Sequence, residues 1–512
     1  MVYHSQQFLK SSVESLGDSV IERITAAYVH ALQCVFYDIS NRGIRVDVER
    51  LKTARAIVTA EIQRNLSIAT SQWGCNVFIG RDNNPGTDGS VNLNATQGEY
   101  ALLKKLKDLG YEVPKITKKN SEGEYESSYS TGELALQKML SANQFKYPGG
   151  DPAIKAILKV REFGKLKSGY LNARLYKRGD DAFYLSVYNA SGTVTGRRSS
   201  KKHTFGFGNN GQNFPEHSEI ARYFRECLIA REGHIFVFVD QVQAEDWPVS
   251  ALSQNYIALQ ELQNGVDRHT KLASAIFSIP IDSRSKEEWK KSMERYLGKK
   301  TRHAHNYDMR EDMMSAQLAK EGHSIGSPEC KLLLSKLDVV EPNVKGVFHK
   351  YVQTVVNNTR VLQTPFGRER QVLGVRPGEY NTQLFKECYA YIPQSVVGDN
   401  TGFSILELES NFNDKWIIQE GHDSITQDVP ASVKDVRKCL QNTLKSFDRR
   451  IRFHNGIEIQ IPIEAKLGYN FHESIKLDDF SEQSIKTALE KLAHERSSKS
   501  AAIENLNLGC IA

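Results

Sequence analysis

A short apolar run, HIFVFVD, dictates much of the architecture of this chain. The run occupies residues 234–240, is rich in β-branched and aromatic residues, and ends in the carboxylate of Asp240. Such a run predicts a buried strand. Two more strands are expected in WIIQEGHDSITQDVP, joined by a tight turn at residues 421–423 that carries Asp423, and another in IEIQIPIEAKLG. We therefore expect a sheet with two aspartates at strand ends.

Helical patterns separate the two aspartates along the chain. Apolar residues recur at helical spacing from residue 251 to residue 355, and a further helix is expected at 382–407. Between them, RVLQTPFGRERQVLG predicts a hairpin that turns at residues 365–367. The expected fold class is therefore α+β, with a sheet that a long helical insertion splits in sequence.

The N-terminal region of the chain predicts helices connected by polar loops. Residues 72–94 are rich in Gly, Asn and Asp and predict a loop, while the polar segment KKNSEGEYESSYS predicts a loop or partial disorder. The C-terminal tail is polar with one short amphipathic stretch at 485–492. The helices expected in the N-terminal region are 18–58 (broken by a turn at 41–43), 99–109 and 131–142.

Asp240 and Asp423 are candidates for binding two Mg²⁺ ions. Mg²⁺ prefers hard oxygen ligands and usually takes one or two carboxylates together with substrate phosphates. Two such ions stabilise the charge that develops on the attacking oxygen, the leaving oxygen and the phosphorus during nucleotidyl transfer. Aspartates at these places are also typical of turns and helix caps, so the pair alone does not decide the function.

A stripe of four residues gives the second candidate site. In ERYLGKKTRHAHNYDM the residues Arg295, Lys299, His303 and Tyr307 are four apart, and each step of four advances about 40° around a helix. One helix face therefore offers two cations followed by two rings. The cations suit a triphosphate, and a ring suits a stacked base. The cations alone would also be typical of a solvated helix, but the rings that continue the stripe favour a nucleotide site.

Hydrogen-bond donors form the third candidate site. SGTVTGRRSS and the following GQNFP supply Arg197, Gln212 and Asn213. Such donors can reach purine N3 and pyrimidine O2, which every correct base pair presents in the minor groove. The same segments are also typical of turns. The surrounding run from residue 155 to 202 is basic and rich in small residues, and the net charge of +6 permits a polyanionic partner.

Taken in order, these segments resemble the motifs of family A DNA polymerases, the DNA polymerase I type. FVDQVQAEDWPVSALSQ resembles motif A, RYLGKKTRHAHNY resembles motif B in a form similar to bacteriophage members, and EGHDSI resembles motif C. TGRRSS with QNFP, TPFGRER, CYAYIPQSVVGD, RGIRVD and KLKSGY also match in order. The resemblance covers roughly residues 35–472.

The resemblance implies a right-hand fold of thumb, palm and fingers. The palm sheet would be antiparallel and split in sequence by the helical fingers. The domains it implies are an N-terminal helical remnant (1–30), thumb (31–180), a first palm segment (181–255), fingers (256–374), a second palm segment (375–478) and a C-terminal tail (479–512).

The resemblance also implies a template-directed DNA polymerase that extends a primer 3′ end with dNTPs by two-metal nucleotidyl transfer. Asp240, Asp423 and the carbonyl of Gln241 would bind two Mg²⁺. Glu245 would be a steric gate that leaves no room for a 2′-hydroxyl. The dNTP would be held by Arg295, Lys299 (which would also protonate the pyrophosphate), His303 and Tyr307. Primer or template would be contacted by Arg197, Gln212, Asn213, Gln394 and His422, and the duplex backbone by Lys165 and Lys167.

Several positions depart from the family pattern. Ser424 stands where motif C usually has Glu, which predicts weaker metal binding without loss of activity. His303 replaces the usual Phe or Tyr, so sugar discrimination is expected to differ. Lys386 and Ala390 stand where Arg and Asn are common, which predicts altered primer-template contacts. Asp308 replaces a Gly, and the sequence offers no reason for it.

Two other classes of protein compete with this interpretation. A single-subunit RNA polymerase is disfavoured by Glu245, because a ribonucleotide enzyme would not block the 2′ position. An inactive, polymerase-derived DNA-binding subunit is disfavoured because the chain retains the carboxylates and the cationic stripe.

No segment resembles the carboxylate motifs of the family's proofreading domain, which precedes the thumb. We therefore expect no 3′–5′ exonuclease in this chain, and a separate exonuclease, helicase or processivity factor is a candidate partner. The seven cysteines are scattered without a CxxC pair, and no signal, transit or membrane-spanning run is seen. These features predict a cytoplasmic protein (host cytoplasm if phage-encoded) without membrane contact.

Overall fold

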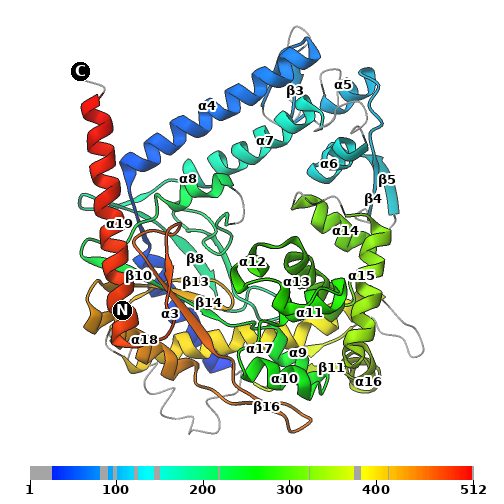
Figure 1. The fold of residues 1–512 in the computed structure, drawn as a ribbon, viewed down its shortest axis with the longest axis vertical. Helices are drawn as coiled ribbons and strands as arrows, with labels where there is room; N and C mark the ends of the chain where they lie inside the picture. The colour runs from blue at the N-terminus through cyan, green and yellow to red at the C-terminus, as the bar shows by residue number, and fades with distance from the viewer. Residues whose placement is uncertain are drawn as a thin grey trace. The chain divides into compact units, whose positions relative to one another are not determined.

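The computed structural model places the chain in two compact units (Figure 1). Unit 1 comprises Met1–Leu51, Ala173–Asp308 and Lys336–Ala512, and unit 2 comprises Lys52–Asn172 and Met309–Ser335. The domain boundaries implied by the resemblance remain predictions. The residues that the structure describes are 26–80, 90–95, 101–119, 125–142, 150–216, 219–321, 323, 325–373, 382–412 and 414–509.

Strand β10 (His234–Gln241) is the central strand of the main sheet of unit 1, as HIFVFVD predicts. All its ladders are antiparallel, and the described chain gives the strand order β13–β14–β10–β17–β18. The two predicted strands on either side of the 421–423 turn are confirmed. The flanking strands are β13 (Ile417–Glu420), β14 (Ser424–Pro430), β17 (Ile463–Gly468) and β18 (Ile475–Lys476).

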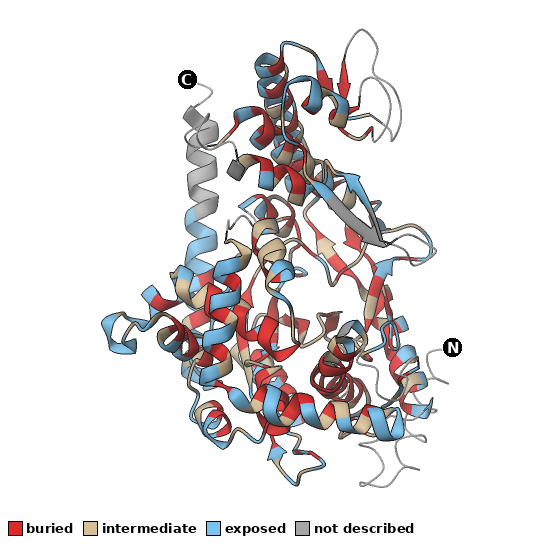
Figure 2. Ribbon diagram, turned by 90° about the vertical axis from the view of Figure 1, so that its right-hand side faces the viewer, coloured by how far each residue is buried: buried red, intermediate tan, exposed pale blue. Residues whose placement is uncertain are grey.

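The apolar side chains of β10 explain its central place. Ile235, Phe236, Val237 and Val239 are all almost completely buried, and burying such side chains stabilises a fold by roughly 1.5–3 kcal/mol each. Helix α18 (Val433–Phe447) packs against β14 and against the long helix α17 (Thr382–Asn411), which confirms the helix expected there. Figure 2 shows in red that buried residues gather in the interior of the fold, whereas exposed residues in pale blue lie on the outer faces of its helices.

The helical insertion between β10 and β14 is confirmed. Within unit 1, α13 packs against α11, and both helices begin at capping side chains. Asp267 accepts hydrogen bonds from the backbone of the first turn of α11, and Ser292 does the same for α13. The described helices and hairpin of unit 1 in this region are α9 (Asp246–Leu252), α10 (Tyr256–Gln263), α11 (Arg268–Phe277), α12 (Lys286–Lys291), α13 (Met293–Asn306), α16 (Lys350–Thr359) and β11–β12 (Val361–Gln363, Glu369–Gln371), and α15 (Ser327–Val340) begins in unit 2 and ends in unit 1.

A second group of elements in unit 1 precedes β10 in sequence. Strand β1 pairs with β7, and β8 pairs with β9. Between β8 and β9 lies the SGTVTGRR segment that carries Arg197. The elements are α3 (Ala26–Arg42), β1 (Ile44–Val46), β6 (Tyr176–Arg178), β7 (Asp181–Tyr184), β8 (Ser186–Asn189) and β9 (Ser199–Lys202).

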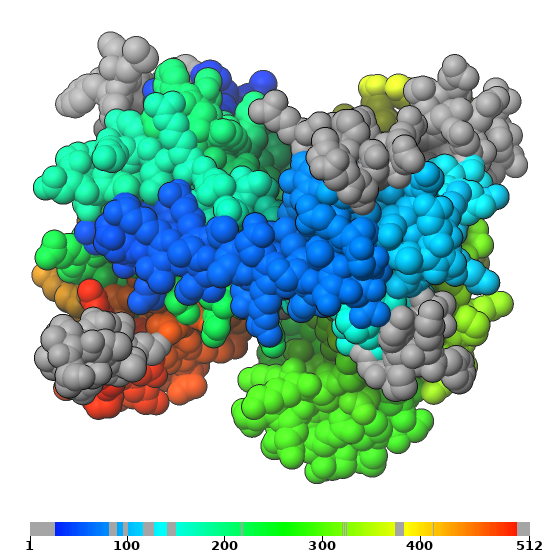
Figure 3. Space-filling view, turned by 90° about the horizontal axis from the view of Figure 1, so that it is seen from above, coloured from blue at the N-terminus to red at the C-terminus, as the bar shows by residue number. Residues whose placement is uncertain are grey.

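Unit 2 is mainly helical. The long helix α4 (Val48–Trp73, blue), which begins in unit 1 and belongs to unit 2 from Lys52 on, forms a continuous band in Figure 3. Helix α7 (Pro152–Leu166) begins at Asp151, whose carboxylate accepts hydrogen bonds from two backbone N–H groups. Helix α6 (Glu133–Ala142) packs against α7 and against α14 (Glu311–Lys320). The helices expected at 99–109 and 131–142 are confirmed as α5 (Leu102–Asp108) and α6.

Three sequence predictions of local structure are wrong. The loop expected in KKNSEGEYESSYS contains β5 (Tyr125–Tyr129), which pairs with β4 (Lys115–Lys119). The two tyrosines of β5 and the Ile-Thr pair of β4 favour strands and outweigh the polar composition. The expected 72–94 loop contains a short parallel pair of strands, β2 (Val77–Phe78) and β3 (Val91–Asn92). IEIQIPIEAKLG forms two strands, β16 (Glu458–Ile459) and β17, separated at Pro462, which cannot donate to a ladder.

The two ends of the chain are only partly described. Residues 26–30 of the expected N-terminal remnant begin α3, and residues 1–25 lie outside the described residues. The amphipathic stretch of the tail falls within α19 (Glu482–Gly509), where Ile485 and Leu492 are buried. Among the described helices, none combines the length and the apolar character that crossing a membrane requires.

Candidate active site

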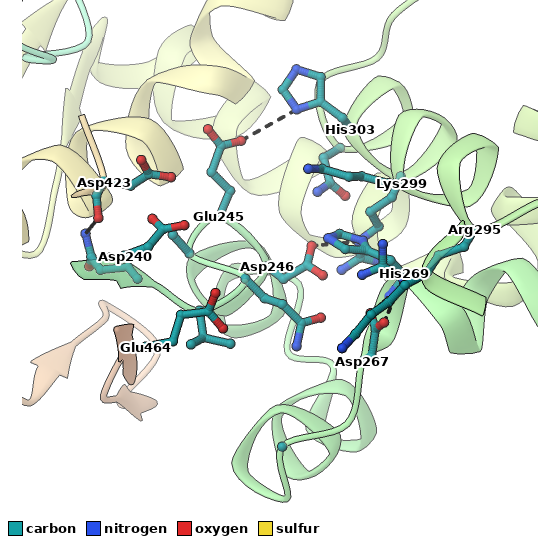
Figure 4. Close-up of a pocket in the computed structure, with 18 of the residues that line it drawn as sticks. Asp240, Glu245, Asp246, Asp267, His269, Arg295, Lys299, His303, Asp423 and Glu464 are labelled. Carbon is teal, nitrogen blue, oxygen red and sulfur yellow. Dashed lines mark hydrogen bonds and ion pairs between the residues drawn. The ribbon is translucent and has the colours of Figure 1, made fainter. Parts of the chain in front are cut away.

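The two predicted aspartates lie close together at one edge of the sheet. In the ladders of β10, Asp240 is opposite Ser424 on one side and opposite Glu464 on the other. Asp423 precedes β14, and its carbonyl accepts a hydrogen bond of 3.2 Å from the backbone N–H of Gln241. Figure 4 shows Asp240, Asp423 and Glu464 as neighbours. The sequence analysis missed Glu464, because strand register cannot be read from sequence.

The turn that carries Asp423 is held from several sides. His422 adopts a left-handed backbone conformation (φ 69°), and its N–H donates to the buried carboxylate of Glu420 at 2.9 Å. Gln212 donates to the same carboxylate. The hydroxyl of Thr401 donates to the carbonyl of His422 at 3.0 Å and accepts from the side chain of Gln241 at 2.8 Å. The position of Asp423 relative to β10 is therefore fixed by buried hydrogen bonds.

The electrostatics of the aspartates suit a divalent cation. Asp240 is exposed to the cavity, but desolvation by the surrounding protein, followed by the charges of Asp423 and Glu464, raises its pKa to about 8. Burial also raises the pKa of Asp423. Carboxylates that destabilise one another's charge bind a hard cation favourably. Within the described residues, no three acidic, histidine or cysteine side chains cluster as a ready-made metal site. The donor set therefore fits ions that take further ligands from substrate and water.

A cavity of about 560 Å³ connects the aspartates to helix α13. Arg295, Lys299 and His303 line it, as their spacing of four residues predicts (Figure 4). The Arg295 guanidinium donates to Asp267 at 2.7 Å. Lys299 is exposed and has no hydrogen-bond or ion-pair partner among the described residues. The lining also includes His269, which the sequence analysis missed and whose pKa is lowered by burial.

The carboxylate of Glu245 is the shared partner of a second cluster of side chains at the same cavity. Arg197 pairs with one of its carboxylate oxygens, and the hydroxyl of Tyr307 donates to the other. Nδ1 of His303 lies 3.7 Å from that second oxygen, and the His303 ring meets the edge of Tyr307 at 5.0 Å. Burial raises the pKa of Tyr307, so its hydroxyl stays a donor. Tyr307 is itself buried and reaches the cavity through Glu245.

The remaining predicted contacts have different surroundings. Gln394 is partly exposed on α17, and Asn213 is exposed just after Gln212. In unit 2, Lys165 is exposed in the last turn of α7, and Lys167 follows that helix. The proposed roles of all these residues stay predictions.

The positions that depart from the family pattern are also described. Lys386 and Ala390 both lie on α17, and Ser424 is the cross-strand neighbour of Asp240. Asp308 follows the end of α13 with φ 54°, a left-handed position that Gly favours and Asp tolerates, which explains this replacement.

Known proteins that are similar to this chain in structure or sequence include polymerases. The fold is similar to a solved structure described as the POL domain of Pol1 from M. smegmatis in complex with DNA primer-template and dNTP, with a TM-score of 0.65 and 20% identity over 86% of this chain and 69% of that chain. This match confirms the expected α+β right-hand fold.

Curated relatives match at the sequence level. DNA polymerase I of Synechocystis sp. is 23% identical over 86% of this chain and 42% of its own length. DNA polymerase of Bacillus phage SP01 is 22% identical over 90% and 52%, and the thermostable DNA polymerase I of Thermus aquaticus is 27% identical over 49% and 26%. The chain thus spans about half the length, or less, of these relatives. The family model for DNA polymerase family A matches residues 87–473, so the chain belongs to DNA polymerase family A.

Proposed function

We propose that this protein is a template-directed DNA polymerase that extends a primer 3′ end with dNTPs. One observation carries the proposal: the exposed cation of Lys299 and the carboxylates of Asp240 and Asp423 open onto the same cavity. A triphosphate in this cavity would place its charge beside Lys299 and Arg295 and its reacting phosphorus toward the carboxylates. Family membership supports the same reaction.

The carboxylates would hold the metal ions of the reaction. Asp240, Asp423 and the backbone carbonyl of Gln241 would hold two Mg²⁺, which when bound supply stabilisation of the phosphoryl charge. Lys299 is suited to donate a proton to the departing pyrophosphate, because no carboxylate of the described chain engages its ammonium group. Arg295 would hold the triphosphate from a position that Asp267 fixes.

Glu245 would choose the sugar of the incoming nucleotide. Arg197 and Tyr307 hold its carboxylate, so the side chain occupies a constant volume from which a 2′-hydroxyl would be excluded. A rate comparison between dNTP and NTP separates this proposal from an RNA polymerase, which would use NTPs at least as well.

The primer-template would lie against residues that also hold the site together. Arg197 binds Glu245, and Gln212 binds Glu420 beneath the Asp423 turn. Contacts from these two residues to the minor groove would therefore report the geometry of the new base pair to the catalytic carboxylates. Asn213, Gln394 and His422 would add contacts to primer or template, and Lys165 and Lys167 contacts to the duplex backbone.

Primer extension by two carboxylate variants tests the proposal. Asp240→Asn and Asp423→Asn should each lower extension at least about a thousandfold and leave primer-template binding near the wild-type value. Glu232→Gln, at an exposed carboxylate away from the cavity, is the matched control and should extend normally. Wild-type protein that binds primer-template but never extends it would identify an inactive DNA-binding subunit.

We also propose that this chain has no 3′–5′ exonuclease and binds metal more weakly because of Ser424. A primer with a mismatched 3′ nucleotide should stay intact when the protein is incubated with Mg²⁺ and no dNTP. Ser424→Glu should lower the Mg²⁺ concentration that gives half-maximal extension, since it adds a carboxylate directly opposite Asp240. Removal of the mismatched nucleotide, or an unchanged Mg²⁺ requirement, would contradict the respective proposal.

A further inference from the structure

A rigid turn in unit 1 presents an aromatic side chain to solvent. Phe205 is 74% exposed at the tip of the turn at residues 203–208. The N–H of Gly206 donates to the carbonyl of His203 at 2.7 Å, and the N–H of His203 donates to the carbonyl of Phe207 at 3.1 Å. Gly206 has φ +81°, a conformation that Gly adopts without strain. The exposed position of Phe205 is therefore built into the backbone.

Rings and a guanidinium support this turn from the side. The rings of Phe207 and Tyr176 meet edge to face at 5.3 Å, and the guanidinium of Arg174 lies 4.7 Å from the centre of the Phe207 ring. The N–H of Gly208 donates to the carbonyl of Arg174 at 2.8 Å, which ties the turn to the strand region that carries Tyr176. Phe205 thus stands beside a stacked cation and not alone on the surface.

Two lysines lead directly into the turn. Lys201 and Lys202 are exposed at the end of β9, and neither is in an ion pair within the described part of the chain. Successive strand residues point to opposite sides, so one of the two lies on the side of Phe205. We call Arg174, Tyr176, Lys201, Lys202, Phe205 and Phe207 the basic-aromatic surface.

Residues 199–211, the segment that carries four of the six residues of this surface, are anchored at both ends at the candidate active site. The segment starts two residues after Arg197, which binds Glu245, and ends just before Gln212, which binds Glu420. The five residue steps from Arg197 to Lys202, the last three of them within β9, span at most about 16 Å at roughly 3.3 Å per residue. Because duplex DNA rises about 3.4 Å per base pair along each strand, this distance corresponds to about five base pairs.

We propose that the basic-aromatic surface grips the backbone of duplex DNA about five base pairs behind the primer end. This inference rests on the proposed polymerase function. The lysines would neutralise phosphates, and the ring of Phe205 would pack against deoxyribose, so the contact would not depend on sequence. The duplex is the partner that fits, because Arg197 and Gln212 at the two ends of the segment face the newly formed base pairs in the proposed function.

Equilibrium binding of primer-template measures this contact directly. Lys201→Gln/Lys202→Gln should raise the Kd for a primer-template with a 16-base-pair duplex about tenfold near 0.1 M salt and reduce the slope of log Kd against log salt by about two. Phe205→Ala should raise the Kd about fivefold. The effects should vanish on a hairpin primer-template whose stem has about four base pairs, which is too short to reach the surface. Extension at saturating DNA should be unchanged, and fewer nucleotides should be added per binding event.

Matched variants control for charge and exposed apolar area. Lys434→Gln/Lys491→Gln removes two exposed lysines of α18 and α19, and Ile257→Ala trims an exposed side chain of α10. Variants of the basic-aromatic surface that bind like these controls would overturn the inference, and so would a loss that follows the length of the single-stranded overhang. Wild-type protein that shows the duplex-dependent contact but extends no primer would refute the polymerase proposal while leaving the surface a DNA contact.

Discussion

Two consecutive carboxylates at the start of α9 have opposite surroundings. Glu245 opens onto the cavity, and its partner Arg197 keeps 27% of its side-chain surface exposed. Asp246, the next residue, is buried against Arg302, which is 2% exposed and donates to it at 2.9 Å. Both carboxylates connect α9 to α13 or its end. The accessible pair of Glu245 and Arg197 can therefore contact a substrate directly. The buried pair of Asp246 and Arg302 can affect the site only by fixing the positions of α9 and α13.

The buried pair of Asp246 and Arg302 belongs to a larger network of ion pairs. Glu341 pairs with both Arg302 and Arg268, and Arg268 also pairs with Glu261 and lies 3.9 Å from Asp246. Burial alone would raise the pKa of Asp246. The charges of Arg302, His269 and Arg268 outweigh this effect and hold the pKa of Asp246 below its usual value. This network fixes α9, α11 and α13, the helices that position Glu245, His269 and Lys299.

Removing one partner from the buried network should give the largest effect. Arg302→Met removes one of the two arginines shared by the buried Asp246 and Glu341 and leaves Arg268 alone to balance them. Loss of one partner from a buried ion pair typically costs about 3–5 kcal/mol in the free energy of unfolding. Urea unfolding measures the loss. Arg295→Met is the control, because its pair with Asp267 is partly exposed and should contribute less than about 1 kcal/mol. Equal losses in the two variants would erase the distinction between the buried and the open pairs.

Truncating the open carboxylate should change selectivity and not stability. Glu245→Ala removes the side chain proposed to exclude the 2′-hydroxyl, so the ratio of kcat/KM for dNTP over NTP should fall roughly a hundredfold. The midpoint of thermal unfolding should shift little, because the Glu245 cluster is partly open to solvent. Unchanged discrimination would show that another residue selects the sugar.

A single hydroxyl in the open cluster should have a smaller effect. Tyr307→Phe removes the donor to one oxygen of Glu245 and leaves Arg197 in place. One such hydrogen bond contributes about 1 kcal/mol, so discrimination against NTP should fall about fivefold. The double variant Tyr307→Phe/Glu245→Ala should be no worse than Glu245→Ala alone if Tyr307 acts through Glu245. Additive losses would assign Tyr307 an independent contact with the nucleotide.

The sequence predicts the residues that open onto the cavity far better than the buried network of ion pairs. HIFVFVD, the 421–423 turn and the spacing of four in α13 are local patterns, so the strand, the turn and the cationic face follow from them. The partners Asp246, Arg268 and Glu341 are far apart in sequence, and isolated charges are typical of solvated surfaces. Only the packing of the helices shows that they meet.

The same limit applies to the sheet. Glu464 lies opposite Asp240 because of the register of β17, and Pro462 separates two strands that alternation alone merges into one. Patterns of hydrophobicity predict that a strand exists, but they do not tell which residue of a neighbouring strand lies opposite each of its residues. The strand register therefore decides which further carboxylate accompanies Asp240.

The smallest expected effect concerns a histidine on the buried side of α13. Burial, and then the charge of Arg302, lowers the pKa of His305 to about 3. The unfolded chain protonates this histidine below about pH 6.5, whereas the folded chain stays neutral. Its contribution to stability is thus complete above pH 6.5 and declines as the pH falls toward 3. Between pH 7.5 and 6.0 the loss should be under about 1 kcal/mol.

His305→Asn should remove this share of the pH dependence while keeping a side chain that can reach Asp338, which lies 3.0 Å from Nε2 of His305. Urea unfolding at pH 7.5, 6.5 and 6.0 measures the free energy of unfolding for both proteins, and the wild type should lose more than the variant over this range. His494→Asn, at an exposed position on α19, should follow the wild type. A His305→Asn profile parallel to the wild type would mean that His305 is protonated in the folded chain. Asp338 would then neutralise the charge of the protonated His305, and the buried side of α13 would be more accessible to water than its ion pairs suggest.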